Sequence, residues 1–321
     1  DDLREDIESA VLVDGVTSIC SCAFFECWRL TTVLIPMSVT SIGDEAFSWC
    51  LRLKSVQIGK SVTSIGKKAF AHCQGLKSIT IPDSVEIIGN GAFAECTFPS
   101  IKIPRSVVSF GGNPFVISDC DPYEGRCVLK EIDISENPNF VFVDGVLMDK
   151  DMTKIIFYVP FKSEVYSIPN TVTTICVGAF YGCGKLTSVS IPDSVTSIGD
   201  EAFYGCERLR SVSIPNSVVS IGSRAYQNCK VLSSIKIPNS LKKIGDEAFA
   251  DCKKLSSFTL PGGVETLGAN LFAWSFALTK ITVVGEGENL KMVDGVLFDK
   301  EMTRLIWCSR EKSGSCEIPD T

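Results

Sequence analysis

The stretch IPDSVTSIGDEAFYGC, residues 191–206, decides the fold because close copies of it recur along the chain. One copy, IPNSVVSIGSRAYQNC, begins 23 residues later, and IPNSLKKIGDEAFADC begins after a further 23. A fixed period of this length is typical of solenoid proteins, whose repeats stack on their neighbours. The first isoleucine of the stretch, Ile191, has counterparts at Leu12, Ile35, Ile58, Ile81, Ile103, Ile134, Ile168, Ile214, Ile237, Leu260 and Val283.

Each repeat follows one frame, which is seen in full between Leu186 and Cys206. Apolar residues at alternate positions predict a short strand, and the proline after it ends that strand because proline cannot donate to a sheet. The glycine of SIG, such as Gly199, predicts a turn with positive φ. The letters DEAF predict a short helical turn that Asp200 caps, with Phe203 facing the core.

A second motif occurs twice and divides the chain. VDGVLMDKDMTKIIFY, residues 143–158, matches VDGVLFDKEMTRLIWC, residues 293–308, at an offset of 150 residues. Each copy reads as two apolar runs around a polar tip, DKDMT or DKEMT, which predicts a β-hairpin. The predicted divisions are an N-terminal cap at residues 1–11, repeat block 1 at 12–134, a hairpin unit at 135–167, repeat block 2 at 168–283, a second hairpin unit at 284–317 and the start of a further repeat at 318–321.

These two motifs carry a resemblance to a known family. IPDSVTSIGDEAFYGC resembles the treponemal-type leucine-rich repeat of BspA-like surface proteins, and DGVLFDKEMTRLIW resembles the hairpin unit found in many of those arrays. The resemblance implies an α/β repeat solenoid, a right-handed superhelix of 23-residue repeats with short parallel strands on one face and two inserted hairpin units. It also implies display on host-associated bacteria or parasites and a role in adhesion and host-protein binding, and it transfers no catalytic residue.

Composition narrows the classes of partner. The formal net charge is −7 and 45% of the residues are hydrophobic, so we expect a folded chain and no nucleic-acid partner. No apolar run approaches the ~18 residues that a transmembrane helix needs. The acidic opening DDLREDIESA has no apolar segment, so we expect any secretory signal to lie outside this chain. The expected location is extracellular or on the cell surface.

The fifteen cysteines fall into distinct groups. Eight share one repeat position, where we expect buried packing, because parallel side chains in a ladder do not point at one another as a disulfide requires. Cys20, Cys22 and Cys27 lack a fourth zinc ligand, so we expect no metal site. The eight are Cys27, Cys50, Cys73, Cys96, Cys183, Cys206, Cys229 and Cys252.

Two cysteine pairs lie outside that group and are disulfide candidates. Cys120 and Cys127 bracket DPYEGR within an insertion, where a local disulfide and two reduced thiols are both open. At the 150-residue offset, Cys308 and Cys316 replace Tyr158 and Tyr166. Because both members of that pair have changed together, we predict that the two positions touch and that Cys308 and Cys316 form a disulfide.

The sequence does not favour an enzyme. The single histidine, His72, lies in a variable slot of the repeat, where we expect it on the surface. Carboxylate pairs such as Asp200 and Glu201 recur with the repeat, whereas a catalytic site is unique. Asp149 and Asp151 at a hairpin tip are too few for a calcium loop. We therefore expect no catalytic residue and no cofactor, and a hydrolase is only a distant alternative.

The outward strand positions are the candidate binding surface. They form a hydroxyl-rich lane with scattered lysines, and we predict a non-enzymatic recognition or adhesion module that binds a protein or glycan there. The alternative is a structural spacer in which the lane is plain strand surface. The candidate residues are Thr32, Ser55, Gln57, Ser78, Thr80, Lys102, Ser188, Ser190, Ser211, Ser213, Ser234, Lys236, Ser257 and Thr259.

Overall fold

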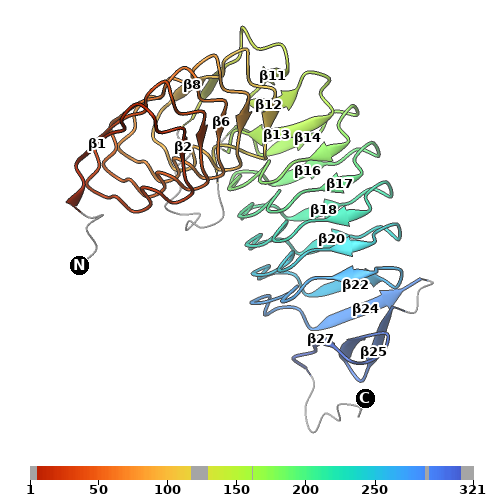
Figure 1. Cartoon of the computed structure of the whole chain (residues 1–321). Helices are drawn as coiled ribbons and strands as arrows, with labels where there is room; N and C mark the ends of the chain where they lie inside the picture. The colour runs from red at the N-terminus through yellow and green to blue at the C-terminus, as the bar shows by residue number, and fades with distance from the viewer. Residues whose placement is uncertain (1–5, 117–128, 161, 286–288, 312–321) are drawn as a thin grey trace. The chain divides into compact units, whose positions relative to one another are not determined.

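The computed structural model describes residues 6–116, 129–160, 162–285 and 289–311. The chain divides into two compact units, unit 1 at residues 1–159 and unit 2 at residues 160–321. In both units, successive repeats form successive turns of a solenoid, as the stacked arrows of β16, β18 and β20 show (Figure 1). The prediction of a repeat solenoid is confirmed. Its α/β label fits only loosely, because the described residues contain no α-helix.

Unit 1 has two ladders of parallel strands and ends in an antiparallel sheet. The first ladder is split, because β1, β3 and β5 form one sheet and β8 pairs only with β10. The first ladder comprises β1 (Ser9–Val11), β3 (Thr32–Leu34), β5 (Ser55–Gln57), β8 (Ser100–Lys102) and β10 (Glu131–Asp133). The second comprises β2 (Ser18–Ile19), β4 (Ser41–Ile42), β6 (Ser64–Ile65), β7 (Ile87–Ile88) and β9 (Ser109–Phe110).

Unit 2 repeats this arrangement. Its first ladder comprises β14 (Val165–Ser167), β16 (Ser188–Ser190), β18 (Ser211–Ser213), β20 (Ser234–Lys236), β22 (Ser257–Pro261) and β24 (Lys280–Val284). Its second ladder comprises β15 (Thr174–Ile175), β17 (Ser197–Ile198), β19 (Ser220–Ile221), β21 (Lys243–Ile244) and β23 (Thr266–Leu267). The sequence predicted strands on one face, and the two-residue strands of the second ladder are an addition to that prediction.

The segment predicted as a helical turn is instead a run of overlapping β-turns. The N–H groups of Ala202, Tyr204 and Cys206 each donate to the carbonyl three residues earlier. Glu201 and Gly205 have φ of 56° and 68°, which type II turns require at their third residue. The remaining N–H groups donate to the next repeat, from Glu201 to Ser223, Phe203 to Ala225 and Gly205 to Gln227. These bonds between repeats exclude the helix, whose N–H groups would bond within one segment.

Two predicted local roles are wrong. Gly199 and its counterparts do not have positive φ; instead, they lie against the preceding turn. A Cβ on Gly222 would lie 2.4 Å from the Asp200 nitrogen, so only glycine allows this spacing. Asp200 does not cap its own turn, because its Oδ1 accepts a hydrogen bond from the N–H of Ser223 at 2.7 Å.

The core is a set of columns, each built from one repeat position. In unit 2 the rings of Phe180, Phe203 and Tyr226 stack at 4.9 and 5.1 Å, and the column continues to Phe249. In unit 1, Phe24, Phe47, Phe70 and Phe93 stack in the same way. Each fully buried side chain of this kind stabilises the fold by about 1.5–3 kcal/mol, and stacking extends that burial to every interior repeat.

The predicted hairpins at DKDMT and DKEMT are confirmed, and each has a second hairpin before it. In unit 1, β12 (Val146–Asp149) pairs antiparallel with both β11 (Phe140–Val143) and β13 (Lys154–Tyr158). In unit 2, β26 (Val296–Asp299) pairs likewise with β25 (Leu290–Val293) and β27 (Leu305–Cys308). Asp-Gly turns at residues 144–145 and 294–295, all with positive φ, form the additional hairpins.

Candidate binding face

The strand face is the outward surface of the first ladder, made of the fourteen candidate residues named above. All of them are exposed, so the predicted direction of these side chains is confirmed. It follows from strand alternation, because Ser188 and Ser190 point out while Val189 between them is buried. That these residues bind a ligand remains a prediction.

The serine and threonine side chains of the repeats belong to two classes. In one class, the hydroxyl is used within the protein. Thr187 donates to the Glu164 carbonyl at 2.9 Å, and Ser217 donates to the Val195 carbonyl at 2.6 Å. Hydroxyls of the other class make no side-chain hydrogen bond to a described residue; they include all the strand-face hydroxyls, which are exposed, and second-ladder hydroxyls such as those of Ser197 and Ser220, which are half-buried. The strand face therefore offers polar groups that the fold itself does not use.

The strand face in unit 1 is hollowed where its ladder is split. No strand forms at Ser78–Thr80, although the sequence predicts one there. A groove of about 890 Å³ opens over this segment, with Ile58, Ile79 and Ile81 among its apolar lining and Gln57, Thr80 and Lys102 among its polar lining. Sequence periodicity alone did not reveal this groove.

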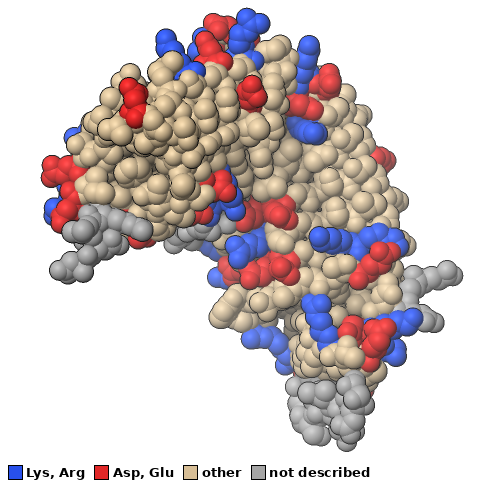
Figure 2. Space-filling view, viewed as in Figure 1, with Lys and Arg blue, Asp and Glu red and all other residues tan. Residues whose placement is uncertain are grey.

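The strand-face lysines differ between the units. Lys102 in unit 1 forms an ion pair with Glu136 at 2.9 Å, and the hydrogen bond from this pair raises the pKa of Lys102. Lys236 in unit 2 makes no ion pair or side-chain hydrogen bond with any described residue. Basic and acidic side chains lie interspersed in small clusters on the face drawn in Figure 2. The strand-face lysine of unit 1 is therefore neutralised by an ion pair, whereas that of unit 2 can pair with a ligand.

The predicted burial of the eight cysteines that share one repeat position is confirmed, because each is at most 6% exposed. Most of these thiols donate to the carbonyl of an aromatic residue 26 positions earlier, as Cys229 does to Phe203 at 3.3 Å. Burial raises the pKa of Cys50 to about 12 and also raises that of Cys229. At physiological pH the thiols of Cys50 and Cys229 are therefore protonated packing groups.

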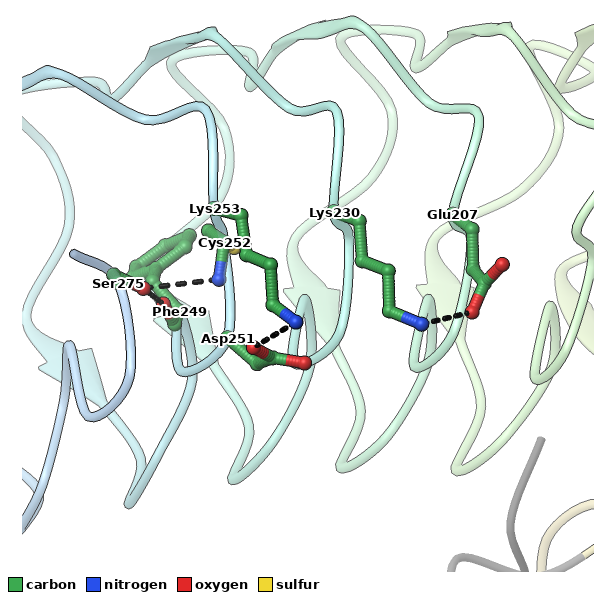
Figure 3. A network of polar contacts seen from close by, with 7 residues as sticks. All are labelled: Glu207, Lys230, Phe249, Asp251, Cys252, Lys253 and Ser275. Atoms are coloured by element: carbon green, nitrogen blue, oxygen red, sulfur yellow. Dashed lines mark hydrogen bonds and ion pairs between the residues drawn. The ribbon is translucent and has the colours of Figure 1, made fainter. Parts of the chain in front are cut away.

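The polar contacts at the edge of this column show how the pattern continues where cysteine is absent. Ser275 occupies the cysteine position of its repeat, accepts from the Cys252 N–H at 2.9 Å and donates to the Phe249 carbonyl at 2.8 Å (Figure 3). Further along the array, Lys230 reaches Glu207 of the preceding repeat at 2.8 Å. A hydroxyl thus replaces the thiol, so the position needs a small hydrogen-bond donor and no cysteine chemistry.

The predicted surface position of His72 is wrong. The imidazole is only 3% exposed and stacks on the Trp49 ring with 3.7 Å between centroids. The cause is the repeat itself, since both residues occupy one position and successive copies of a position stack. Asp149, considered for calcium, accepts hydrogen bonds at 2.6–2.7 Å from Thr153 and Lys154, which close the hairpin tip.

An exposed aromatic pair was missed by sequence reasoning. Trp274 is 66% exposed and Phe276 is 51% exposed, and the Arg310 guanidinium lies 4.3 Å from the Phe276 ring centre. Both aromatics lie in the turn before β24 and are not among the fourteen strand-face residues. The available signal was LFAWSF, residues 271–276, which places one aromatic residue directly before and one directly after the cysteine position at Ser275.

The disulfide candidates remain predictions. Cys308 is an exposed free thiol at the end of β27, and its predicted partner Cys316 lies outside the described residues. Cys120 and Cys127 also lie outside them. Among the described residues, no cluster of His, Cys, Asp or Glu side chains has a metal-binding arrangement. No helix in the described part of the chain is long and apolar enough to cross a bilayer.

With this geometry in view, comparison with known proteins assigns a family. Residues 4–120 and 151–293 match the BspA type leucine-rich repeat region in six copies. The chain belongs to the BspA-type leucine-rich repeat family. This match confirms the resemblance inferred from IPDSVTSIGDEAFYGC. Leucine-rich repeat domains are generally protein-interaction modules and are typically non-enzymatic scaffolds.

Solved structures of bacterial leucine-rich repeat proteins are similar to this BspA-type chain. A leucine-rich cell surface protein from Faecalibacterium prausnitzii is 30% identical, with a TM-score of 0.68 over 87% of this chain and 80% of that one. A leucine-rich repeat protein from Eubacterium ventriosum is 28% identical, with a TM-score of 0.66 over 87% and 73%. The pneumococcal vaccine antigen PcpA, 22% identical with a TM-score of 0.53 over 88% and 73%, shares the fold. No curated protein matches the chain.

Proposed function

We propose that this BspA-type chain is a non-enzymatic recognition or adhesion module that binds an extracellular or host macromolecule through its strand face. The similar F. prausnitzii protein is described as a cell surface protein, which supports placing this chain on a cell surface or outside the cell. The partner class is a protein or a glycan.

The observation that carries the proposal is the division of the hydroxyl groups. Thr187 and Ser217 satisfy carbonyls of the preceding repeat, whereas Ser188, Ser211 and Ser234 are exposed and make no side-chain hydrogen bond to a described residue. A face that repeats available donors and acceptors at the ~4.8 Å spacing of strands suits a long ligand held by many weak contacts.

The test is a binding screen of the purified chain against immobilised extracellular-matrix proteins and glycans. The variant Ser211→Glu/Ser234→Glu places two charges on the strand face. The matched variant Val219→Glu/Thr266→Glu adds the same charge at exposed positions in or beside the second ladder, where neither side chain makes a hydrogen bond to a described residue. We expect the first variant to weaken binding at least tenfold, about 1.4 kcal/mol, and the matched variant to leave affinity within about twofold.

Two outcomes would count against this function. Equal affinities for the wild type and both variants would show that the ligand uses another surface, with the exposed pair Trp274 and Phe276 as the next candidate. A folded chain that binds no matrix protein and no glycan would favour the spacer alternative, in which the strand face is only strand surface.

A further inference from the structure

Two arginines in unit 2 lie side by side at the edge of the strand face. In the sequence ERLRSVS, Leu209 is completely buried, while Arg208 and Arg210 on either side of it are exposed. Both arginine side chains therefore lie on the outer surface, in the turn immediately before β18 begins at Ser211. The repeat frame therefore presents two cations together next to the strand-face hydroxyls.

These arginines line a groove that leads onto the strand face. A hollow of about 590 Å³ is lined by Arg208, Arg210, Glu164, Thr187, Val231 and Ser233. A second hollow, of about 500 Å³, has Ser188, Ser190, Ser211, Ser213 and Lys236 in its lining. The two are neighbours, because Thr187, Arg210 and Ser233 of the first hollow directly precede Ser188 and Ser211 of the second and Ser234 beside it.

The cations of this cationic groove, defined as Arg208, Arg210 and Lys236 with the hydroxyls between them, are uncompensated. Their side chains make no ion pair or hydrogen bond with any described residue. By contrast, Lys230 is paired with Glu207 at 2.8 Å. Glu164 and Asp193 are the carboxylates that line the two hollows, so three cations face two anions in a chain of net charge −7.

The arrangement has the dimensions of an extended anionic ligand. From Arg210 to the end of β18 at Ser213 is three residues, about 10 Å along the strand, and Lys236 lies at the corresponding end of the neighbouring β20. Serine hydroxyls occupy the space between the cations. Anionic groups placed at both ends would meet cations, and neutral hydroxyls between them would meet serines.

We propose that the cationic groove binds an acidic glycan, with Arg208 and Arg210 holding one sulfate or carboxylate and Lys236 a second. A guanidinium donates two parallel hydrogen bonds to such groups, which gives orientation as well as attraction. The floor of serines suits sugar hydroxyls, while the single exposed apolar side chain in the lining, Val231, offers no anchor for an acidic peptide. The proposal rests on the proposed function, because it names a ligand class for the same strand face.

The experiment measures the affinity of the full chain for chondroitin sulfate, which carries sulfate and carboxylate groups, and for hyaluronan, which carries carboxylate alone. Neutral dextran and poly-glutamate are the comparison ligands. We expect Arg208→Gln/Arg210→Gln to weaken binding of chondroitin sulfate tenfold or more. Binding that needs sulfate should be absent with hyaluronan, and binding that needs only carboxylate should be similar for both glycans.

The matched variant is Arg52→Gln/Lys54→Gln, which removes the same two charges from the same repeat positions in unit 1. These side chains are exposed and make no ion pair or side-chain hydrogen bond with a described residue, so the variant tests net charge. We expect less than a twofold change. Equal losses in both variants would overturn the proposal, because binding would then follow net charge.

Other results separate this proposal from the proposed function. If no acidic glycan binds, or if poly-glutamate binds as well as chondroitin sulfate, the glycan assignment is wrong. The proposed function survives that result when Ser211→Glu/Ser234→Glu still weakens a matrix-protein ligand. If that variant weakens no matrix-protein ligand while both it and Arg208→Gln/Arg210→Gln weaken chondroitin sulfate, the groove stands and the wider strand face is the wrong surface for proteins.

Discussion

The first ladder of unit 1 is split where the strand at residues 78–80 is missing, whereas unit 2 keeps every strand and its ladder divides only between the sheets β14 to β20 and β22 to β24. Three departures from the repeat meet at the split. Gly59 replaces the usual proline and lies so near Pro36 that a Cβ would be 2.3 Å from its carbonyl oxygen. The repeat ending at Ile103 is one residue short, and Pro99 stands where other repeats donate an N–H.

The comparison separates what the repeat needs from what it tolerates. Turn bonds continue past the split, since Phe70 donates to Ala92 at 2.8 Å and His72 donates to Ala94 at 2.8 Å. The strand ladder can therefore be interrupted while the turns and the aromatic column hold the array together. The split exposes a groove in unit 1, and the continuous part of the unit 2 ladder, from β14 to β20, supports the cationic groove.

The largest expected effect comes from raising pH. Folded Cys50 has a pKa of about 12 against an ordinary value of 9.0, because burial disfavours the thiolate. Unfolded thiols lose protons above about pH 9 while folded ones keep them, so stability is present below pH 9 and falls as pH rises. By pH 12 the titration of this thiol alone lowers the free energy of unfolding by about 4 kcal/mol. Burial also raises the thiol pKa of Cys73, Cys96, Cys206, Cys229 and Cys252.

Urea unfolding at pH 7.5 and pH 10 measures this loss in the wild type and in Cys229→Ser, which copies the arrangement at Ser275. The serine variant should lose less stability between the two pH values. Thiol labelling of the native chain compares the units, because Cys96 near the split is 6% exposed and should react before the fully buried Cys229. Identical stability at both pH values would contradict the prediction.

Phe203→Ala should be the most damaging single substitution in the regular column. It removes a ring that stacks on both neighbours and leaves a cavity, so we expect a loss of about 3–5 kcal/mol. Phe93→Ala, beside the split and 6.1 Å from Phe70, should cost less because the looser surroundings can relax. Hydrogen exchange should show damage beyond residues 200–206. Damage confined to that segment would argue against a stacked solenoid.

A glycine pair tests how closely the turns approach in the two units. A Cβ at Gly245 in unit 2 would lie 2.3 Å from the Ser223 nitrogen, whereas at Gly111 in unit 1 the nearest atom is 3.2 Å away. Gly245→Ala should therefore cost about 1–3 kcal/mol through overpacking, and Gly111→Ala well under half of that. Thermal unfolding measures both. Equal costs would mean that the spacing of the turns does not decide the need for glycine.

The smallest expected effect is repair of the split. Pro99→Lys restores an N–H at the position from which Lys54 donates to Thr31 at 2.8 Å. One new backbone bond is worth about 0.5–1.5 kcal/mol, partly offset by the greater freedom of the unfolded chain. Amide exchange at residues 78–80 should slow. If protection there stays unchanged while the variant folds normally, the missing donor is not what splits the ladder.

The repeat, the strand face, the buried cysteines and the hairpins at DKDMT and DKEMT could be predicted, because each depends on one position recurring at a fixed spacing. The overlapping β-turns at DEAF could not be predicted from the sequence, because they depend on backbone hydrogen bonds to the next repeat. The sequence predicted a positive φ at Gly199 because a positive φ and a close approach between turns both select glycine, and the sequence alone does not distinguish them. The Asp-Gly turns at residues 144–145 and 294–295 were readable as hairpin signals and were overlooked.

The cationic groove and the groove at Ser78–Thr80 lay beyond sequence reasoning for a different reason. Both grooves depend on residues that differ from the repeat consensus. A consensus predicts only what the repeats share, so it does not predict the effect of these differences. Whether Arg208 is paired, and whether a ladder closes across Pro99, depends on the separation of neighbouring turns. That quantity appears only when the turns are stacked in space.

Gly199 and its counterparts have a consequence for how the number of repeats in such a gene can change. Every turn with a glycine such as Gly222 presents the same close-fitting backbone surface to the turn before it, whatever its other residues are. Recombination that adds or deletes one whole 23-residue repeat therefore joins two surfaces that already fit. The length of the strand face can then change between generations in steps of one strand, so a lineage could adjust how firmly it holds a long ligand without altering any existing contact.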